Sequence, residues 1–524
     1  MRRRQVLGAA AGMAGLGGLG VAGCNDRLDA VAAARWLGAG HERGHRLRSL
    51  DAPVITAAAA LKRAHVLVLG AGVAGLAAAR ALLQSGVDDL RVLELEDEAG
   101  GNSRATQLGG MACPLGAHYL PLPGAHAHEV QQLLFELGLA RSEFGRTVYD
   151  EHHLCHSPHE RLYFEGAWHE GLLPPAAVGS PTAAQYRRFA GLVAQARRDV
   201  GFAVPSLRVP FGPGQAALDA VTFTQWLEEH DLRDEHLRWY LDYCCRDDYG
   251  AAAQTVSAWA GLHYFASRHG FAAEADDAQR EPVLTWPQGN AWLTQALAAP
   301  LGERLLCGRV VLRVNEARHE VQVLAFNEHS GELEDWRARR VVLALPLFVA
   351  QRVLQDPPPA LAAALAGMAW APWLVANLHL REPLLQRVGA EPAWDNVIHE
   401  SRGLGYVDAM HQSLRSAPGP TVLTAYWALP VEQRGALLSE PASTWAQRVL
   451  ADLVPTHPDL PAKLQEVALM RHGHAMSVPR PGVRSNQALA ALCAQCGRIR
   501  FAHADLAGYS VFEEAYTAGW LAAG

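Results

Sequence analysis

Lysine is nearly absent from this chain. Among 46 basic side chains in 524 residues, only Lys62 and Lys463 are lysines, and 53 acidic side chains give a formal net charge of −7. A chain with this mild acidity and a pI near 6.4 is not expected to offer a basic face to nucleic acid. The same charge does not repel a cationic ligand.

Long apolar runs are also missing after residue 24. Charged residues interrupt every later run before it reaches the roughly twenty residues of a membrane span. The composition, 50% hydrophobic and 19% charged, favours a globular body with enough chain for two or three domains. No internal repeat is visible, so a repeat architecture is not expected.

The most informative motif in the chain is a glycine-rich segment that follows an apolar run. An apolar run over residues 66–69 leads into Gly70-x-Gly72-x-x-Gly75. Gly70 permits a tight turn after the strand, Gly72 lets a pyrophosphate approach the backbone, and Gly75 lets helix and strand pack closely. This spacing predicts a strand, a turn and a helix that together bind a dinucleotide.

The residues that follow support the same site. A helix beginning near Val73 and Ala74 would point its free N–H groups and its positive end at the phosphates. Glu94 ends a second apolar run at roughly the twenty-residue offset that the motif requires, and it is placed to accept hydrogen bonds from ribose hydroxyls.

The pair Gly100-Gly101 narrows the choice of dinucleotide. Here the sequence resembles the flavoprotein superfamily of flavin-containing amine oxidases, phytoene desaturases and protoporphyrinogen oxidases, in which Gly-Gly-Arg follows the ribose-binding Glu and approaches the FAD pyrophosphate. This chain has Asn102 at the Arg position. Either Arg104 makes that contact from two residues further on, or the contact is missing.

Later segments extend the resemblance to FAD enzymes. The family carries a small segment near the flavin, which matches Gly116 and Ala117, and a backbone contact to adenine, which matches Val311. It also ends in a strand, an acid and a helix, which match residues 497–504, Asp505 and residues 512–521. The resemblance implies that this last helix aims its N-terminus at the flavin, where helix N–H groups stabilise negative charge on the reduced ring.

Because these motifs lie at the start, middle and end of the chain, the FAD domain must be discontinuous. We predict an α/β protein whose Rossmann-type FAD-binding domain comprises residues 62–119, 282–347 and 482–524. An inserted α+β substrate domain comprises residues 120–281 and 348–481. Residues 25–61 are expected to form a tether and a flap on the FAD domain.

Local patterns predict several elements of the substrate domain. Residues 160–168 alternate in polarity around Glu-Gly and indicate a hairpin. Helical spacing is found over residues 184–200 and 223–243, and strands are expected at 374–380 and 421–428.

The N-terminus has the form of an export signal. Residues 2–4 are arginines, residues 8–23 form an uncharged Ala/Gly/Leu run, and Cys24 follows Val-Ala-Gly. This order resembles the twin-arginine leader and the lipobox of bacterial lipoproteins. We expect residues 1–24 to direct export of the folded protein, with lipid on Cys24 holding it to a membrane surface in the periplasm or cell envelope. An uncleaved basic anchor is the alternative.

Cysteine and histidine spacing leaves metal binding open but disfavoured. Cys493 and Cys496 have CxxC spacing, for which a disulfide, a metal half-site and unpaired thiols are all possible, and an incidental or structural pair is favoured. His152, His153, His156 and His159 would alternate faces on an extended chain, so a polar strand and turn is favoured over a metal site.

The catalytic groups are less clear. In the amine oxidase branch, a lysine on a strand resembling residues 373–380 holds a water at the flavin, and this strand has no lysine here. His118, beside the small segment near the expected flavin, is the first titratable candidate, and Tyr509 is a second. From the sequence alone, a structural role in packing is favoured over a catalytic role for both side chains.

The sequence therefore predicts an exported FAD-dependent oxidoreductase that accepts a hydride from an amine or polyamine, or from a related C–N or C–C substrate. One alternative is a dehydrogenase or desaturase that passes electrons to a quinone or partner. Another is a flavin-bearing binding protein without catalysis.

Overall fold

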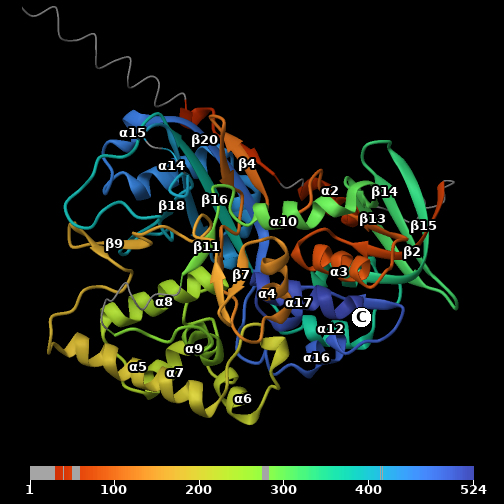
Figure 1. The fold of residues 1–524 in the computed structure, drawn as a ribbon, viewed down its shortest axis with the longest axis horizontal. Coiled ribbons are helices and arrows are strands. Elements are labelled where there is room, and N and C mark those ends of the chain that lie inside the picture. Colours follow the sequence, from red (N-terminus) through yellow and green to blue (C-terminus); the bar gives the residue numbers. More distant parts are fainter. Residues whose placement is uncertain (1–29, 39–40, 50–59, 274–281, 414, 416) are drawn as a thin grey trace, which may run out of the picture.

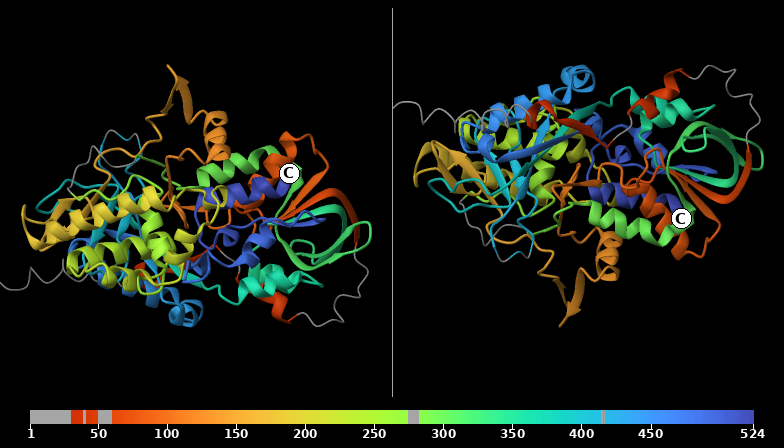
Figure 2. Two further views of the ribbon diagram at one scale, coloured as in Figure 1. Left: turned by 90° about the horizontal axis from the view of Figure 1, so that it is seen from below. Right: turned by 90° about the horizontal axis from the view of Figure 1, so that it is seen from above.

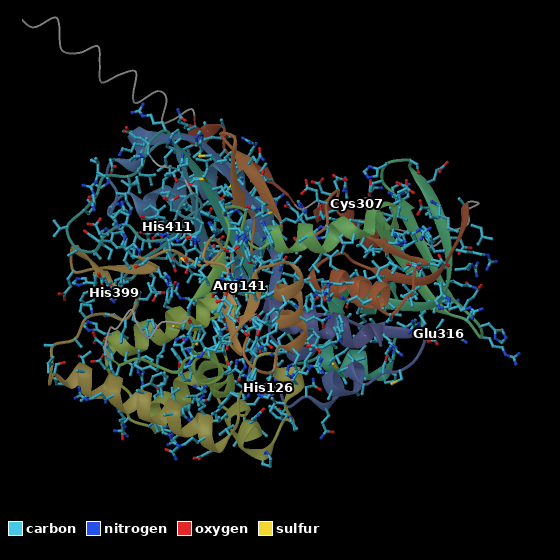
Figure 3. The ribbon with its side chains drawn as sticks, viewed as in Figure 1. His126, Arg141, Cys307, Glu316, His399 and His411 are labelled. Atoms are coloured by element: carbon cyan, nitrogen blue, oxygen red, sulfur yellow. The ribbon has the colours of Figure 1, made fainter. Side chains whose placement is uncertain are left out.

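The computed structural model describes residues 30–38, 41–49, 60–273, 282–413, 415 and 417–524. Within these residues the chain forms two large sheets, in different halves of the molecule (Figure 1). Glu316 at the end of a strand in one sheet and His399 just after a strand in the other lie on opposite sides of the same view (Figure 3).

The first sheet has a parallel core and an antiparallel extension. Its order is β12-β3-β2-β15-β14-β13, and β21 takes the place of β14 beside the last residues of β15. The strands are β2 (Ala60–Leu69), β3 (Leu90–Leu93), β12 (Leu305–Leu306), β13 (Arg309–Glu316), β14 (Val321–Asn327), β15 (Glu332–Leu343) and β21 (Ile499–Phe501). β12, β3, β2, β15 and β21 run parallel.

Helices cover both faces of the parallel core, which is why residues 66–69 of β2 form a continuous apolar run. Val66 and Val68 join a core with α3 (Val73–Gln84), α4 (His128–Glu136), α10 (Ala291–Ala298) and α17 (Phe512–Ala523). Leu67 and Leu69 face the other way, toward α11 (Leu347–Val353), α12 (Pro359–Leu365) and α16 (Gln487–Cys493).

The second sheet has eight strands in the order β1-β20-β16-β19-β18-β17-β9-β10. They are β1 (Arg35–Leu37), β9 (Glu160–Phe164), β10 (Ala167–Glu170), β16 (Trp370–Leu380), β17 (Asp395–Ile398), β18 (Tyr406–Asp408), β19 (Thr421–Ala428) and β20 (Leu464–Ser477).

Side chains alternate across this sheet as the pleat requires. Trp373 and Val375 join a core with the helices α5 (Pro181–Asp199), α6 (Pro213–Asp219), α7 (Phe223–Glu229), α8 (Glu235–Tyr249) and α9 (Ala258–Ala266), which lie together in the lower left of Figure 1. Leu374 and Ala376 pack on the opposite face with α14 (Ala442–Leu453).

Smaller elements complete the fold. They are the strand pairs β4 (Ala105–Leu108) with β5 (Met111–Pro114), β6 (Tyr119–Pro121) with β11 (Val283–Thr285) and β7 (Ala140–Glu143) with β8 (Arg146–Tyr149), and the helices α2 (His41–Ser49), α13 (Arg434–Ser439) and α15 (Leu460–Lys463). The β7–β8 hairpin projects from the body in both views of Figure 2.

The predicted α/β fold class is confirmed, and so are most local elements. β9 and β10 form the predicted hairpin around Glu165 and Gly166, and β19 covers the predicted strand. The helix predicted over residues 223–243 is wrong as a single element. It breaks after α7 because Asp231 adopts a positive φ of 52° and the Asp234 side chain caps a new helix by accepting from the Leu237 N–H.

The described part of the N-terminal segment packs against both halves of the molecule. Residues 35–37 form β1, which pairs in parallel with β20, and α2 then lies against the dinucleotide half through an Arg43–Asp97 ion pair of 3.0 Å. The predicted export signal at residues 1–24, including Cys24, lies outside the described residues. In the ranges that the structure describes, no helix combines the length and apolar character needed to cross a bilayer.

Candidate functional site

A cavity of about 470 Å³ runs along the carboxyl ends of the parallel strands. Residues following β2, β3 and β15 line one stretch of it, and β16, β19, β20 and α8 line the other, so both sheets contribute walls. Open α/β sheets bind their ligands in the crevice outside the carboxyl ends of the strands, at the point where the strand order reverses.

The glycine loop forms the floor of this cavity. Gly70 has a φ of +98°, and a Cβ there would lie 2.5 Å from the Ala344 carbonyl oxygen. A Cβ on Gly75 would overlap the Gly70 carbonyl oxygen, so this glycine serves the packing of α3 on β2. A Cβ on Gly72 would meet only the Gly101 Cα, at 3.9 Å, and would otherwise project into the cavity.

The N-terminus of α3 faces the cavity without a protein partner. Gly72 is its N-cap residue and no side chain caps the helix, while Val73 and Ala74 line the cavity. Uncapped N–H groups at a helix N-terminus bind anions. These observations fit a pyrophosphate at the glycine loop.

Glu94 lies at the neighbouring strand end. Its carboxylate accepts from the Ala71 N–H at 2.6 Å and from the Glu96 N–H at 3.0 Å, and it lines the cavity. Burial raises the pKa of Glu94, partly offset by these two amides and by Arg104. The fixed carboxyl suits the recognition of ribose hydroxyls.

The glycine pair after Glu94 closes over the loop. Gly100, Gly101 and Asn102 line the cavity, and Asn102 donates from Nδ2 to the Ala475 carbonyl at 2.7 Å. Arg104 instead donates from Nε to the Gly101 carbonyl at 3.1 Å and pairs with Glu96 at 3.5 Å. Arg104 is not among the cavity-lining residues, so its predicted cofactor contact stays a prediction, and its observed contacts support the loop.

The other predicted cofactor residues lie along the same cavity. Val311 lines it at one end, close to Gly44 and Leu47 of α2, and Gly116 and Ala117 line it towards the other end. α2, which lies within the segment predicted to be a tether and flap, contributes Gly44 and Leu47 to this wall.

Asp505 is fixed in its charged form. It accepts from the Leu347 N–H at 3.0 Å and from Trp370 Nε1 at 3.1 Å, with His503 beside it. Burial would raise the pKa of Asp505, but His503 and these donors outweigh it and the pKa is lowered. This side chain therefore cannot exchange protons at neutral pH.

His118 lies in an aromatic wall at the far end. Its ring stacks on Tyr426 with centroids 4.4 Å apart and lies 5.3 Å from Trp394. No described residue hydrogen-bonds to its ring nitrogens, and burial lowers the pKa of His118 to about 3. The imidazole is therefore neutral. Its predicted catalytic role stays a prediction.

Tyr509 lies elsewhere. It is fully buried, its hydroxyl donates to Glu514 at 2.5 Å, and it is not among the residues that line the cavity. Neither lysine lines the cavity either: Lys62 pairs with Glu334 at 2.8 Å, and Lys463 pairs with Asp459 at 3.0 Å.

At the chamber end of the cavity, the structure adds four charged residues that the sequence reasoning missed. Asp247 and Asp248 on α8, Arg268 after α9 and Glu513 on α17 all line the cavity. Asp248 pairs with Arg268 at 3.1 Å. The only sequence signal was two adjacent acids at the end of a helix, and nothing in the sequence joined them to Glu513.

Other sequence motifs do not gather into a site. Cys493 and Cys496 are both free thiols. Of the four histidines between residues 152 and 159, His152 and His159 have different hydrogen-bond partners. His152 lies 2.9 Å from Asp150, and His159 lies 2.7 Å from the Cys155 carbonyl. Within the described part of the chain, no three metal-binding side chains come together.

The site has the form of a dinucleotide-binding cavity that joins a Rossmann-type loop to an aromatic, charged chamber. The open space over Gly72, the uncapped α3 and Glu94 fit the diphosphate and ribose of FAD.

A family model described as flavin-containing amine oxidoreductase matches residues 73–524. The chain belongs to this family, and its cofactor is FAD.

Curated relatives match part of the chain. A Mycobacterium tuberculosis protein that bears the provisional name flavin-containing monoamine oxidase is 27% identical over 304 residues, which cover 56% of this chain and 59% of that protein. The chain thus spans about three fifths of this relative. Polyamine oxidase 1 of Zea mays is 40% identical over 55 residues, 10% of this chain and 11% of that one.

Several solved structures are similar in fold to this chain over most of its length. Putrescine oxidase bound to putrescine has a TM-score of 0.67 at 18% identity, and cyclohexylamine oxidase from Brevibacterium oxydans has 0.65 at 19%, each covering 88% of this chain and 98% of the other. A fatty acid isomerase from P. acnes has 0.60 at 15%, covering 87% and 97%. At these identities the likeness shows the fold alone.

Proposed function

We propose that this protein oxidises a cationic amine at its FAD. The observation that carries the proposal is the charge of the chamber beyond the glycine loop, where Asp247, Asp248 and Glu513 face one cation, Arg268, whose side chain is 12% exposed. An excess of carboxyl groups in a cavity with low-dielectric walls attracts a protonated amine.

The walls of the chamber favour the same ligand. Tyr426, His118 and Trp373 line it, and aromatic faces attract cations while excluding water from the carbon to be oxidised. His118 is neutral, so it adds no positive charge against an incoming ammonium.

FAD, when bound, supplies the acceptor for a hydride from the carbon next to nitrogen. The chain's own residues then have distinct tasks. Gly72 and the α3 N-terminus would hold the diphosphate, and Glu94 would hold the ribose. Val511, the uncapped first residue before α17, lines the cavity so that the helix N-terminus faces into it.

The acceptor of the electrons is a separate proposal. In the described cavity wall no lysine is present, whereas the oxygen-using branch that the sequence resembles places one beside the flavin. This favours, as a second candidate, a dehydrogenase that passes electrons to a quinone or a partner protein. A non-catalytic flavin carrier is the outcome if no amine reduces the protein.

A reduction assay separates these candidates. The purified holoprotein is mixed without oxygen with putrescine, cyclohexylamine or benzylamine, and the visible flavin band is followed. We expect bleaching by at least one amine. Rapid recovery in air selects the oxidase, and recovery only with a soluble quinone selects the dehydrogenase. A flavin that no amine bleaches contradicts the proposed function.

We also propose that the protein is exported by the twin-arginine route and anchored by lipid at Cys24. The supporting pattern is the arginine-rich start, the uncharged run and the lipobox-like Val-Ala-Gly-Cys. Replacing Cys24 by Ala should move the protein from the membrane fraction to the soluble envelope fraction. Continued membrane association would favour an uncleaved anchor.

A further inference from the structure

The cavity contains five carboxyl groups, and they fall into two sets. Glu94 and Asp505 are held by backbone or indole N–H groups, and Asp248 is paired with Arg268. Asp247 and Glu513 have no hydrogen bond or ion pair with another described residue. The first set is held by donors or a counter-ion from the protein, whereas Asp247 and Glu513 are not.

Glu513 is the more enclosed of the two. Its side chain is only 3% exposed, yet it lines the cavity from the first turn of α17. A buried carboxyl whose only donor is its own backbone N–H is costly to keep charged, unless a ligand compensates it. Ser510, Val511 and Phe512 line the cavity beside Glu513, and Arg268 and Asp248 of the chamber are near enough to influence its charge.

We propose that Glu513 accepts the proton of the substrate ammonium group. This inference rests on the proposed amine oxidation and names a residue for a step that the reaction requires. An ammonium nitrogen has no lone pair, so the C=N bond cannot form as the hydride leaves. Proton transfer breaks an N–H bond, leaves its electron pair on nitrogen and forms an O–H bond on the Glu513 carboxylate. Total charge is conserved.

Proton affinity separates Glu513 from His118. Burial raises the pKa of Glu513 to about 7, while burial lowers the pKa of His118 to about 3. Relative to an ordinary carboxyl with a pKa of 4.5, Glu513 binds a proton about 300-fold more tightly. His118 holds a proton far too weakly to remove one from an amine.

The charged groups around Glu513 tune this exchange. Arg268 favours its carboxylate form, and Asp248 and the adjacent Glu514 disfavour it. Charged side chains on the elements packed against α17 have partners of their own: Arg80 donates to Tyr516, Arg208 pairs with Glu129, Arg500 donates to the Ala522 carbonyl, and Asp505 is held beside His503.

Asp247 is the competing acceptor. Its pKa is also raised to about 7, by burial and by Asp248, but it lies on α8 and is only half-buried. It therefore provides the matched comparison, because Asp247→Asn and Glu513→Gln each remove one titrating carboxyl from the same cavity.

The test is the pH dependence of flavin reduction in the holoenzyme. Putrescine, or cyclohexylamine if it reduces the protein faster, is mixed without oxygen at pH 6–10. In the wild type the second-order rate of reduction should rise through pH 7 and then level, because only the carboxylate accepts a proton. Glu513→Gln should lower this rate about 100-fold near neutral pH.

The Glu513→Gln defect should shrink as pH approaches the amine pKa of about 10, where neutral amine is available without a protein base. Glu513→Asp should restore part of the rate at pH 7. A defect that stays the same at pH 10 indicates a structural role and overturns the proposal. So does a rise through pH 7 that persists in Glu513→Gln and is lost in Asp247→Asn.

A spectroscopic titration tests the residue without turnover. Difference infrared spectra of the oxidised holoprotein should lose a carboxylic acid carbonyl band as pH rises through 7. In Asp247→Asn, the carbonyl band of Glu513 should still disappear as pH rises, and only the band of Asp247 should be missing. In Glu513→Gln, the carbonyl band of Glu513 should be missing at every pH. If no amine reduces the wild type, the proposed function fails. If amines reduce it but Glu513→Gln matches it at every pH, only this inference fails.

Discussion

At the dinucleotide end of the cavity, backbone atoms face the ligand, whereas at the chamber end side chains do. Gly70 and Gly72 bring peptide groups and a helix N-terminus to the surface, and no side chain caps that helix. The chamber is walled by Tyr426 and His118 and charged by residues from separate helices. A ligand that is bound by backbone groups needs positions without side chains. A ligand that is bound by side chains needs segments distant in sequence to be packed side by side.

The largest expected effect comes from filling the backbone end. Gly72→Leu should abolish FAD binding, because the side chain would occupy the space over the loop, while the fold tolerates it. Gly72 has a φ of −72°, which any residue can adopt, and its Cβ meets only one atom within 4 Å. The flavin-to-protein absorbance ratio and circular dichroism measure the two effects.

Gly191→Ala on α5 is the control, because a Cβ there meets nothing within 4 Å. It should keep its flavin. Normal FAD content in Gly72→Leu would show that the diphosphate does not lie over Gly72. The dinucleotide end of the cavity would then not bind its ligand through exposed backbone groups.

A smaller effect, on stability, is expected from the chamber end. Arg268→Met leaves Asp248 buried without its partner, and losing one member of a buried pair costs about 3–5 kcal/mol. The free energy of unfolding in urea should fall accordingly.

Arg246→Met is the matched comparison, since Arg246 pairs with Asp242 at 3.1 Å in a more exposed position. That pair should contribute only about 0–1 kcal/mol. Equal losses in both variants would mean that the Asp248–Arg268 pair is no more enclosed than the Asp242–Arg246 pair.

The smallest effect is expected at His118. His118→Phe keeps a ring against Tyr426, so the rate of amine oxidation should fall by no more than about 10-fold, the range of one aromatic contact. Because the pKa of His118 is about 3, its loss should leave the pH profile between 5 and 9 unchanged.

His118→Ala should lower the rate further by opening the wall. If instead the pH profile changes in His118→Phe, the imidazole exchanges protons in turnover, and the division of roles between His118 and Glu513 would have to be reversed.

Much of the dinucleotide end could be predicted because its residues are close in sequence. Gly70, Gly72 and Glu94 lie within a single strand–helix–strand unit, and each has a fixed backbone task. The fold class followed from this unit and from the matching terminal helix. Prediction was weaker where a side chain could contact either the cofactor or the protein. Arg104 is such a case, and in the structure it contacts Gly101 and Glu96.

The helix break at Asp231 shows a different limit. Helical spacing continued across residues 230–234, but a positive φ and an Asp234 cap began a new helix there. Local capping chemistry competes with apolar periodicity, and a short interruption changes the direction of α8. That direction carries Asp247 and Asp248 to the cavity.

The sequence by itself determined the cofactor site, because a dinucleotide loop is a local backbone structure that glycine spacing specifies. Only the tertiary structure decided which charges meet in the chamber. Asp247, Arg268 and Glu513 come from α8, the segment after α9 and α17, and they are brought together by packing between the two halves of the molecule. Burial at that junction, which no local pattern encodes, raises the pKa of Glu513 to about 7.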